Sequence, residues 1–99
     1  MMISTFKVDI NDIAPELTSR PVGAGARRQL LALLEEHDSV EIDFHFKSLT
    51  PSFADECVGQ LAGLIGMRNF RERVKLTNLT ETAKPLMKHV ILTRCSSAK

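Results

Sequence analysis

The stretch "SVEIDFHFKSLTPSFADECVGQLAGLIG", residues 39–66, decides the fold, because a strand pattern in it is followed at once by a helix pattern. Residues 39–46 alternate between apolar and polar side chains, as in a strand with one buried face. Apolar residues then recur at helical spacing from Ser52 or Phe53 to Ile65, and Gly66 suits the position just after a helix. The inward side of the predicted strand consists of Val40, Ile42, Phe44 and Phe46.

The residues before this stretch show a similar order of patterns. Residues 3–10 predict a strand, and residues 11–25, with two Pro and two Gly, have the composition of a mobile loop. Residues 26–37 are strong helix formers with a leucine-rich stripe, and they predict a helix. The inward side of the predicted first strand consists of Ser4, Phe6, Val8 and Ile10.

The residues after this stretch predict a third strand and a last helix. The strand is "ERVKLTNL", residues 72–79, and the helix covers about residues 82–94. Thr82 is the expected N-cap, because it places Pro85 in the first turn, where proline is tolerated. Residues 95–99 are expected to fray. The order strand, helix, strand, helix, strand, helix predicts one α/β domain over residues 1–99, with a mostly parallel or mixed sheet of three to four strands.

Composition excludes several functional classes. The chain has 99 residues, 43% apolar and 25% charged, with a net charge of +1, so no strong field favours nucleic acid or an anionic membrane. No run of about 18 apolar residues and no export signal is present, so we expect a cytoplasmic protein with free thiols at Cys57 and Cys95. The three histidines show no metal-ligand spacing, so we expect neither a metal nor a cofactor.

The start of the helix in the first stretch has two equally good capping solutions. Ser52 as N-cap with Asp55 three residues later resembles a capping box, and Thr50 as N-cap places Pro51 at the first helical position. The same geometry can serve a switch, because a phosphate on the Ser52 hydroxyl would meet the positive end of the helix. Asp55 and Glu56 would repel that phosphate, so it should change binding more than folding.

The segments "VEIDFHFKSLTPSFADECVGQL" and "LTNLTETAKPLMKHVI" resemble the bacterial STAS-like domain family of unknown function. The resemblance extends from about Arg20 to Arg94 and is most specific over residues 52–56. That family is similar in turn to the STAS domains of anti-sigma-factor antagonists, in which the first Ser of an Asp-Ser-Ser-Gly turn is phosphorylated by a partner kinase. Ser52 takes the place of that Ser, whereas Pro51, Phe53 and Ala54 replace the Asp, the second Ser and the Gly.

The resemblance implies a STAS-like fold and a non-catalytic regulatory module that works by binding proteins. The implied partner is a histidine-kinase-like ATPase of the anti-sigma type, and Ser52 is the implied phosphorylation site. A homodimer is also compatible with this role. The implied binding face consists of Lys47, Ser48, Thr50, Ser52, Asp55 and Glu56.

Two other functions stay open at this point. One is a constitutive interaction or assembly domain in which Ser52 only caps a helix. The other is a nucleotide-binding protein that uses the glycine-rich turn "GAGARR", Gly23–Arg28, although this turn lacks the P-loop spacing. Cys57 lies on an apolar helix stripe, which favours core packing over a nucleophile, and no pocket or nucleophile accompanies Glu41 and Asp43.

Overall fold

The computed structural model describes residues 4–96. Residues 51–65 form one unbroken helix with a π-helical turn, labelled η1, in its middle, and we call it the helix 51–65. The elements in chain order are β1 (Thr5–Asp9), α1 (Ile10–Ile13), α2 (Arg20–Glu36), β2 (Ser39–Asp43), α3 (Pro51–Ala54), η1 (Asp55–Gly59), α4 (Gln60–Ile65), α5 (Met67–Arg73), β3 (Val74–Thr77) and α6 (Ala83–Ser96).

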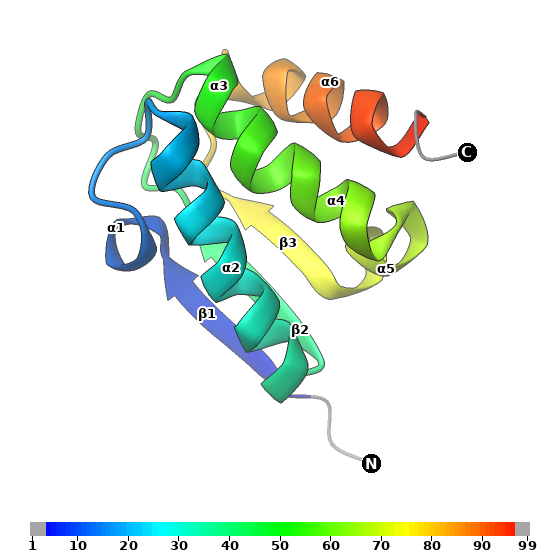
Figure 1. The fold of residues 1–99 in the computed structure, drawn as a ribbon. Helices are drawn as coiled ribbons and strands as arrows, with labels where there is room; N and C mark the ends of the chain where they lie inside the picture. The colour runs from blue at the N-terminus through cyan, green and yellow to red at the C-terminus, as the bar shows by residue number, and fades with distance from the viewer. Residues whose placement is uncertain (1–3, 97–99) are drawn as a thin grey trace.

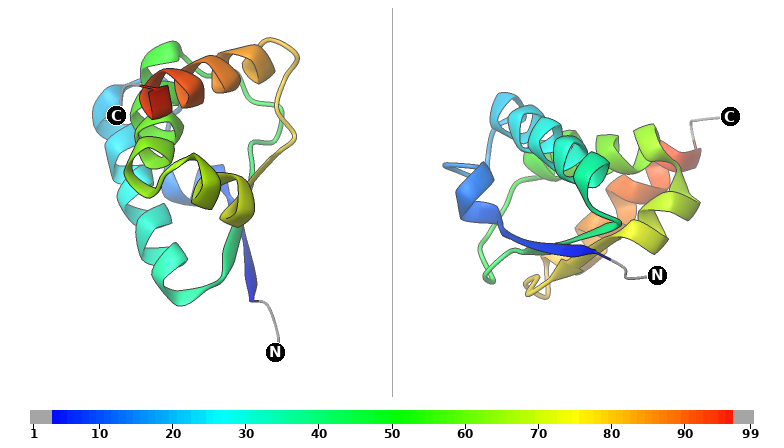
Figure 2. Two further views of the ribbon diagram at one scale, coloured as in Figure 1. Left: turned by 90° about the vertical axis from the view of Figure 1, so that its right-hand side faces the viewer. Right: turned by 90° about the horizontal axis from the view of Figure 1, so that it is seen from below.

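The three strands form a parallel sheet in the order β1-β2-β3, so the predicted α/β fold is confirmed with three strands. Both crossovers step across the sheet in the same direction, and right-handed connections then place both helices on one face. Figures 1 and 2 show α2 and the helix 51–65 side by side on that face. The opposite face is polar, with a row of Lys7, Glu41 and Lys75 in register across the three strands.

The core lies between the sheet and the helix layer. Val40, Ile42 and Phe44 are buried, as the alternation predicted, and Phe53 faces them from the helix 51–65. Cys57 is buried in the same core. Apolar burial of this kind is the main favourable term in folding.

Two glycines let the helices approach closely. A Cβ on Gly59 would lie 3.1 Å from the carbonyl oxygen of Val90, so α6 can pack against the helix 51–65 here. A Cβ on Gly23 would lie 3.2 Å from the carbonyl oxygen of Phe53, so α2 packs there just as closely. Residues 51–65 are therefore held between α2 and α6.

The segment predicted as a loop, residues 11–25, is instead partly helical. It contains residues 11–13 of α1 and the first turns of α2, which begins six residues before the predicted start at Ala26. The Ser19 hydroxyl accepts a hydrogen bond from the Val22 N–H, and Pro21 sits in the first turn, where its missing N–H does no harm. The Pro and Gly content of this segment predicted a loop. The Ser19 cap and the close packing of Gly23 against the helix 51–65 stabilise a helix there instead.

Two predicted strands are shorter than expected. β2 ends at Asp43, and His45 and Phe46 adopt left-handed backbone angles (φ 53° and 55°). Phe46 is therefore 64% exposed rather than inward, because the chain leaves the strand before reaching it. β3 begins at Val74, since the preceding residues complete the short helix α5.

The first strand and the last helix also differ from the predictions. Val8 and Ile10 are buried as predicted, although Ile10 belongs to α1, whereas Phe6 is 37% exposed and Ser4 is also exposed. The hydroxyl of Thr80, not Thr82, accepts a hydrogen bond from the Ala83 N–H at the start of α6, which continues to Ser96. Residues 1–3 and 97–99, including Ile3 and the end of the predicted tail, lie outside the described residues. No helix within residues 4–96 is long and apolar enough to cross a bilayer.

Candidate functional site

The turn between β2 and the helix 51–65 is fastened to the neighbouring turn after β3. The Phe44 N–H donates to the Thr77 carbonyl at 3.0 Å, and the Phe46 N–H donates to the Asn78 carbonyl at 2.8 Å. Asn78 also has a left-handed backbone (φ 55°), and its side-chain amide donates to Asp43 at 2.9 Å. These contacts hold the exposed ring of Phe46 on a rigid turn.

A second set of contacts joins the ends of β1 and β2. The His45 Nε2 atom lies 2.7 Å from an Asp9 oxygen and 3.6 Å from an Asp43 oxygen. The backbone N–H of Asn11 chiefly lowers the pKa of Asp9, and the Asn78 side chain chiefly lowers that of Asp43. Both carboxylates are therefore ionised beside the imidazole at neutral pH.

Thr50 caps the helix 51–65, so the second of the two predicted capping solutions is the correct one. Its hydroxyl accepts a hydrogen bond from the Phe53 N–H at 3.2 Å and donates to the Thr18 carbonyl at 2.7 Å. Ser52 follows Pro51 in the first helical turn and is half-buried. Its hydroxyl makes no hydrogen bond with the part of the chain that the structure describes.

Asp55 and Glu56 lie in a cluster of three arginines from α2 and α6. Arg94 holds Asp55 with two hydrogen bonds, of 2.8 and 2.6 Å, and Arg20 contacts Asp55 at 3.0 Å and Glu56 at 3.1 Å. Arg27 contacts Glu56 at 3.1 Å and also donates to its backbone carbonyl. We call these five residues the arginine cluster.

The arginine cluster keeps both carboxylates ionised. The Arg94 hydrogen bonds lower the pKa of Asp55 to about 2, and the Arg27 hydrogen bond lowers the pKa of Glu56. Asp55 and Glu56 are therefore not open negative charges that would simply repel a phosphate, as expected from the sequence. The cluster carries three positive charges against two negative ones.

Ser52 lies at the edge of a cavity of about 480 Å³ between α2, the helix 51–65 and α6. Arg20 lines it from α2, and His89 and Arg94 line it from α6. Arg20 and Arg94, which are both paired with Asp55, thus line the same cavity as the Ser52 hydroxyl, beside the first turn of a helix. Arginine side chains and helix N-termini stabilise phosphate oxygens. We call this the Ser52 cavity.

The structure brings together part of the predicted binding face. Ser52 and Asp55 share the cavity, whereas Lys47 and Ser48 are exposed earlier on the turn. The hydroxyl of Thr50 is engaged in capping, and Glu56 belongs to the arginine cluster. Sequence reasoning missed Arg20, His89 and Arg94, which no motif connects to Ser52, and it missed Phe46 as an exposed side chain.

The other candidate sites find no support in the geometry. Gly23–Arg28, predicted as a phosphate-binding turn, lies within α2, and Arg27 is paired with Glu56. Burial raises the pKa of the Cys57 thiol to about 12, so it is a packing residue. Within residues 4–96, no group of three acidic, histidine or cysteine side chains could hold a metal ion.

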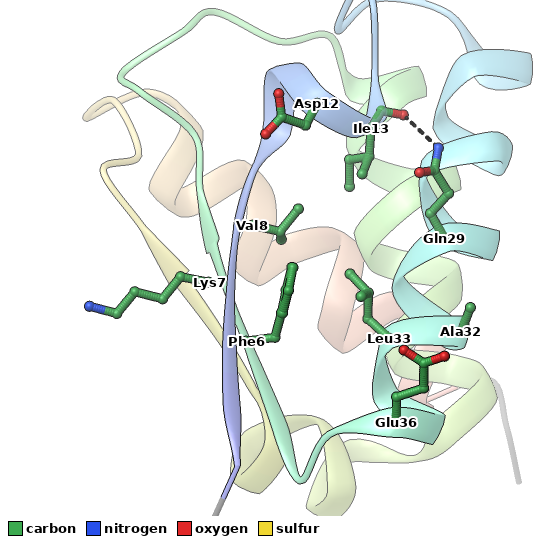
Figure 3. Close-up of a pocket in the computed structure, with 9 residues that line it drawn as sticks. All are labelled: Phe6, Lys7, Val8, Asp12, Ile13, Gln29, Ala32, Leu33 and Glu36. Carbon is green, nitrogen blue, oxygen red and sulfur yellow. Dashed lines mark hydrogen bonds between the residues drawn. The ribbon is translucent and has the colours of Figure 1, made fainter.

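A second cavity lies at the β1 edge of the sheet, between β1 and α2, with a volume of about 380 Å³. In Figure 3 the side chains of Phe6, Val8 and Leu33 point into it, and Gln29 donates to the Ile13 carbonyl at its upper end. Its charged lining residues are Lys7, Asp12 and Glu36, but the Lys7 side chain points away from the groove to the opposite face of the sheet (Figure 3). We call this the β1 groove.

Comparison with known families identifies the domain. A family model described as "STAS-like domain of unknown function (DUF4325)" matches residues 26–84, more than half of the chain. The chain belongs to this STAS-like family. No curated protein and no solved structure matches the chain.

The matched part of this STAS-like domain covers the core of the site but not all of it. It contains β2, the whole helix 51–65 and β3, and therefore includes Ser52, Asp55 and Glu56. Arg20 lies before the matched residues, and His89 and Arg94 lie after them. The basic lining of the Ser52 cavity is thus supplied by segments that flank the matched part of the domain.

Proposed function

We propose that this STAS-like domain is a non-catalytic regulatory module that binds a partner protein through the start of the helix 51–65 and is switched by phosphorylation of Ser52. The proposed partner is a bacterial histidine-kinase-like ATPase of the anti-sigma type, which acts in the cytoplasm. The observation that carries the proposal is the Ser52 hydroxyl, which has no hydrogen bond within residues 4–96 and shares a cavity with Arg20, His89 and Arg94. The similarity of the family to anti-sigma-factor antagonists supports the choice of partner.

In the proposed reaction the partner transfers the γ-phosphoryl group of ATP to Ser52. The Oγ–P bond forms as the bond between the γ-phosphorus and the bridging oxygen breaks, ADP leaves, and a base on the partner accepts the hydroxyl proton. A phosphoserine carries about −1.5 to −2 charges at neutral pH. This charge outweighs the single surplus positive charge of the arginine cluster, so phosphorylation changes the combined charge of Ser52 and the arginine cluster from positive to negative.

The exposure of Phe46 supports its inclusion in the proposed docking surface. Phe46 is 64% exposed and lies on the same turn as Lys47 and Ser48, which hydrogen bonds to the turn after β3 hold in place. Exposed aromatic residues on rigid supports supply much of the binding energy of protein interfaces. We include Phe46 in the docking surface as its apolar anchor.

The alternative in which Ser52 is only a helix cap is weakened, because Thr50 provides the cap. The nucleotide-binding alternative loses its turn, because Gly23–Arg28 is helical. Constitutive binding without phosphorylation remains the outcome against which the switch is tested.

The phosphorylation test uses a purified histidine-kinase-like ATPase of the anti-sigma type from the same organism, with Mg²⁺ and ATP. We expect intact-protein mass spectrometry to show the addition of one phosphate to the wild type and to Ser48→Ala, and none to Ser52→Ala. Ser48 is the matched control, because it is an exposed serine on the same turn. A partner that binds but adds no phosphate, or that still phosphorylates Ser52→Ala, would contradict the switch.

The docking test compares two exposed apolar side chains. Phe46 and Leu64 are 64% and 63% exposed, but Leu64 lies on α4, away from the turn. We expect Phe46→Ala to weaken partner binding at least about tenfold, and Leu64→Ala to leave it unchanged, as measured by calorimetric titration. Equal losses for both variants, with unchanged melting temperatures, would remove Phe46 from the interface.

A further inference from the structure

A groove on the other side of α6 has features of a second docking site. It lies between α5, β3 and α6 at the β3 edge of the sheet (Figure 1) and has a volume of about 390 Å³. Phe70, Leu76, Met87 and Ile91 supply apolar side chains to it, and Leu92 at its border is 45% exposed. We call this the α5–α6 groove.

All charged residues that line the α5–α6 groove are basic. They are Arg71 on α5 and Lys84 and Lys88 on α6. Arg71 and Lys88 make no ion pair with the described part of the chain, and the pair of Lys84 with Glu81 is exposed on both sides. An exposed pair of this kind contributes little, so Lys84 stays accessible to another anion.

The basic residues are arranged along the groove rather than at one end. Lys84, Lys88 and Leu92 follow one another at intervals of four residues, so they form a line along α6, each about one turn from the next. Arg71 faces this line from α5. A ligand with a single anionic head would use one of these charges, whereas an acidic helix would present carboxylates at the same one-turn spacing.

The β1 groove serves as a comparison for the charge of the α5–α6 groove. It has nearly the same volume and a similar apolar lining, but the charged side chains on its own side of the sheet are the acidic Asp12 and Glu36, because Lys7 points to the opposite face (Figure 3). Charge complementarity therefore disfavours an acidic partner in the β1 groove and favours one in the α5–α6 groove.

We propose that the α5–α6 groove binds an acidic amphipathic helix of a protein partner. The apolar stripe of that helix lies on Leu76, Ile91 and Leu92, and its flanking carboxylates pair with Arg71, Lys84 and Lys88. This is the helix-in-groove mode of recognition, with electrostatic complementarity on the rim. The site is separate from the Ser52 cavity, because the residues of α6 that line the two cavities lie on opposite sides of its buried stripe.

The test uses two fluorescently labelled designed peptides of about 15 residues with leucines at i, i+3, i+4 and i+7. One peptide has Glu at the flanking positions, and the other has Lys there. Fluorescence anisotropy should show saturable binding of the Glu peptide and no binding of the Lys peptide. Binding of the Glu peptide should weaken at least about tenfold in Lys88→Glu and in Arg71→Glu, and should weaken as salt is raised.

The matched control is Lys75→Glu, which makes the same change at an exposed lysine on the open face of the sheet. It should leave peptide binding unchanged, as should Ser52→Ala, so this test is independent of the proposed switch. Equal binding of both peptides, an equal loss in Lys75→Glu, or no saturable binding would overturn the proposal. Binding of decanoate instead of the peptide, or a dimer in sedimentation that Leu92→Ala dissociates, would assign the groove to another occupant and also overturn it.

Discussion

The two ends of the parallel sheet use their polar side chains differently. At the amino end, Arg73 donates to the backbone carbonyls of Leu34, His37 and Asp38, with distances of 3.1 Å to His37 and 2.8 Å to Asp38. At the carboxyl end, His45 and Asp43 contact mainly other exposed side chains beside the turn that carries Phe46. At the amino end a half-buried side chain joins separate backbone segments, whereas at the carboxyl end exposed side chains lie beside an accessible surface.

The two ends of the sheet therefore have different roles, one in the stability of the fold and the other in partner binding. Arg73 places a cation at the carboxyl end of α2, where the helix dipole favours it, and joins α2 to the start of β2. The carboxyl ends of the strands are where ligands bind in open parallel sheets. We therefore expect substitutions at the amino end to change the free energy of unfolding, and exposed substitutions at the carboxyl end to change partner binding.

The largest effect is expected at the amino end. Arg73→Ala removes the three hydrogen bonds of a charged group and should lower the free energy of unfolding by about 3 kcal/mol. Urea denaturation measures this loss, with Arg68→Ala as the control, because Arg68 lies on the same helix with its side chain 93% exposed. The proposed division of roles between the two ends would be wrong if Arg73→Ala and Arg68→Ala were equally stable. It would also be wrong if Arg73→Ala remained folded but no longer bound the partner.

An intermediate effect is expected from the arginine cluster beneath the docking surface. The pKa of Asp55 is lowered from 3.8 to about 2, chiefly by hydrogen bonds from Arg94. The folded state therefore binds this proton more weakly than the unfolded state, and the stabilisation is complete above pH 3.8 and is lost as the pH falls towards 2. The side chain is 17% exposed, and the loss should be on the order of 2 kcal/mol.

Asp55→Asn isolates this contribution from the other carboxylates. We expect the variant to be less stable than the wild type at pH 7, with the difference shrinking as the pH falls through this range. Urea denaturation at several pH values measures both curves. If the two curves of unfolding free energy against pH were parallel, Asp55 would have the same pKa in the folded and unfolded chains. That result would contradict the prediction.

The smallest stability effect is expected at the carboxyl end. His45→Ala removes contacts with Asp9 and Asp43, but these side chains are exposed, so the loss of unfolding free energy should be smaller than in Asp55→Asn. Its effect on partner binding should be larger than its effect on stability, because the turn that holds Phe46 loses its link to β1. A melting temperature as low as that of Arg73→Ala would show that the two ends do not divide these roles.

Local patterns predicted the central part of the fold. Alternation predicted β2 and the burial of Ile42, and helical spacing predicted the helix 51–65, because packing onto one core fixes both patterns. The start of α2 was missed, since Pro21 and Gly23 resemble loop residues until the neighbouring helix is in place. Phe46 was assigned to the wrong side because alternation does not show where a strand ends.

The candidate site was less predictable than the fold. The sequence pointed to Ser52 and to the acidic pair after it, but not to the cations around them. Arg20 and Arg94 lie 35 and 39 residues from Asp55 in the chain, on different helices. Such pairs arise from tertiary packing, and a single sequence carries no local signal for them.

The π-helical turn η1 sets the register between the two halves of the helix that contains Ser52. The Gln60 N–H donates to the carbonyl of Asp55, five residues back instead of four. The π-helical turn takes up one residue more than an α-helical turn, so an uninterrupted α-helix of the same sequence would rotate everything after it by about 100° relative to Ser52. Gly59 would then turn away from Val90, and α6 could not bring Arg94 to Asp55. The length of this turn thus coordinates a serine at one end of a helix with an arginine on another.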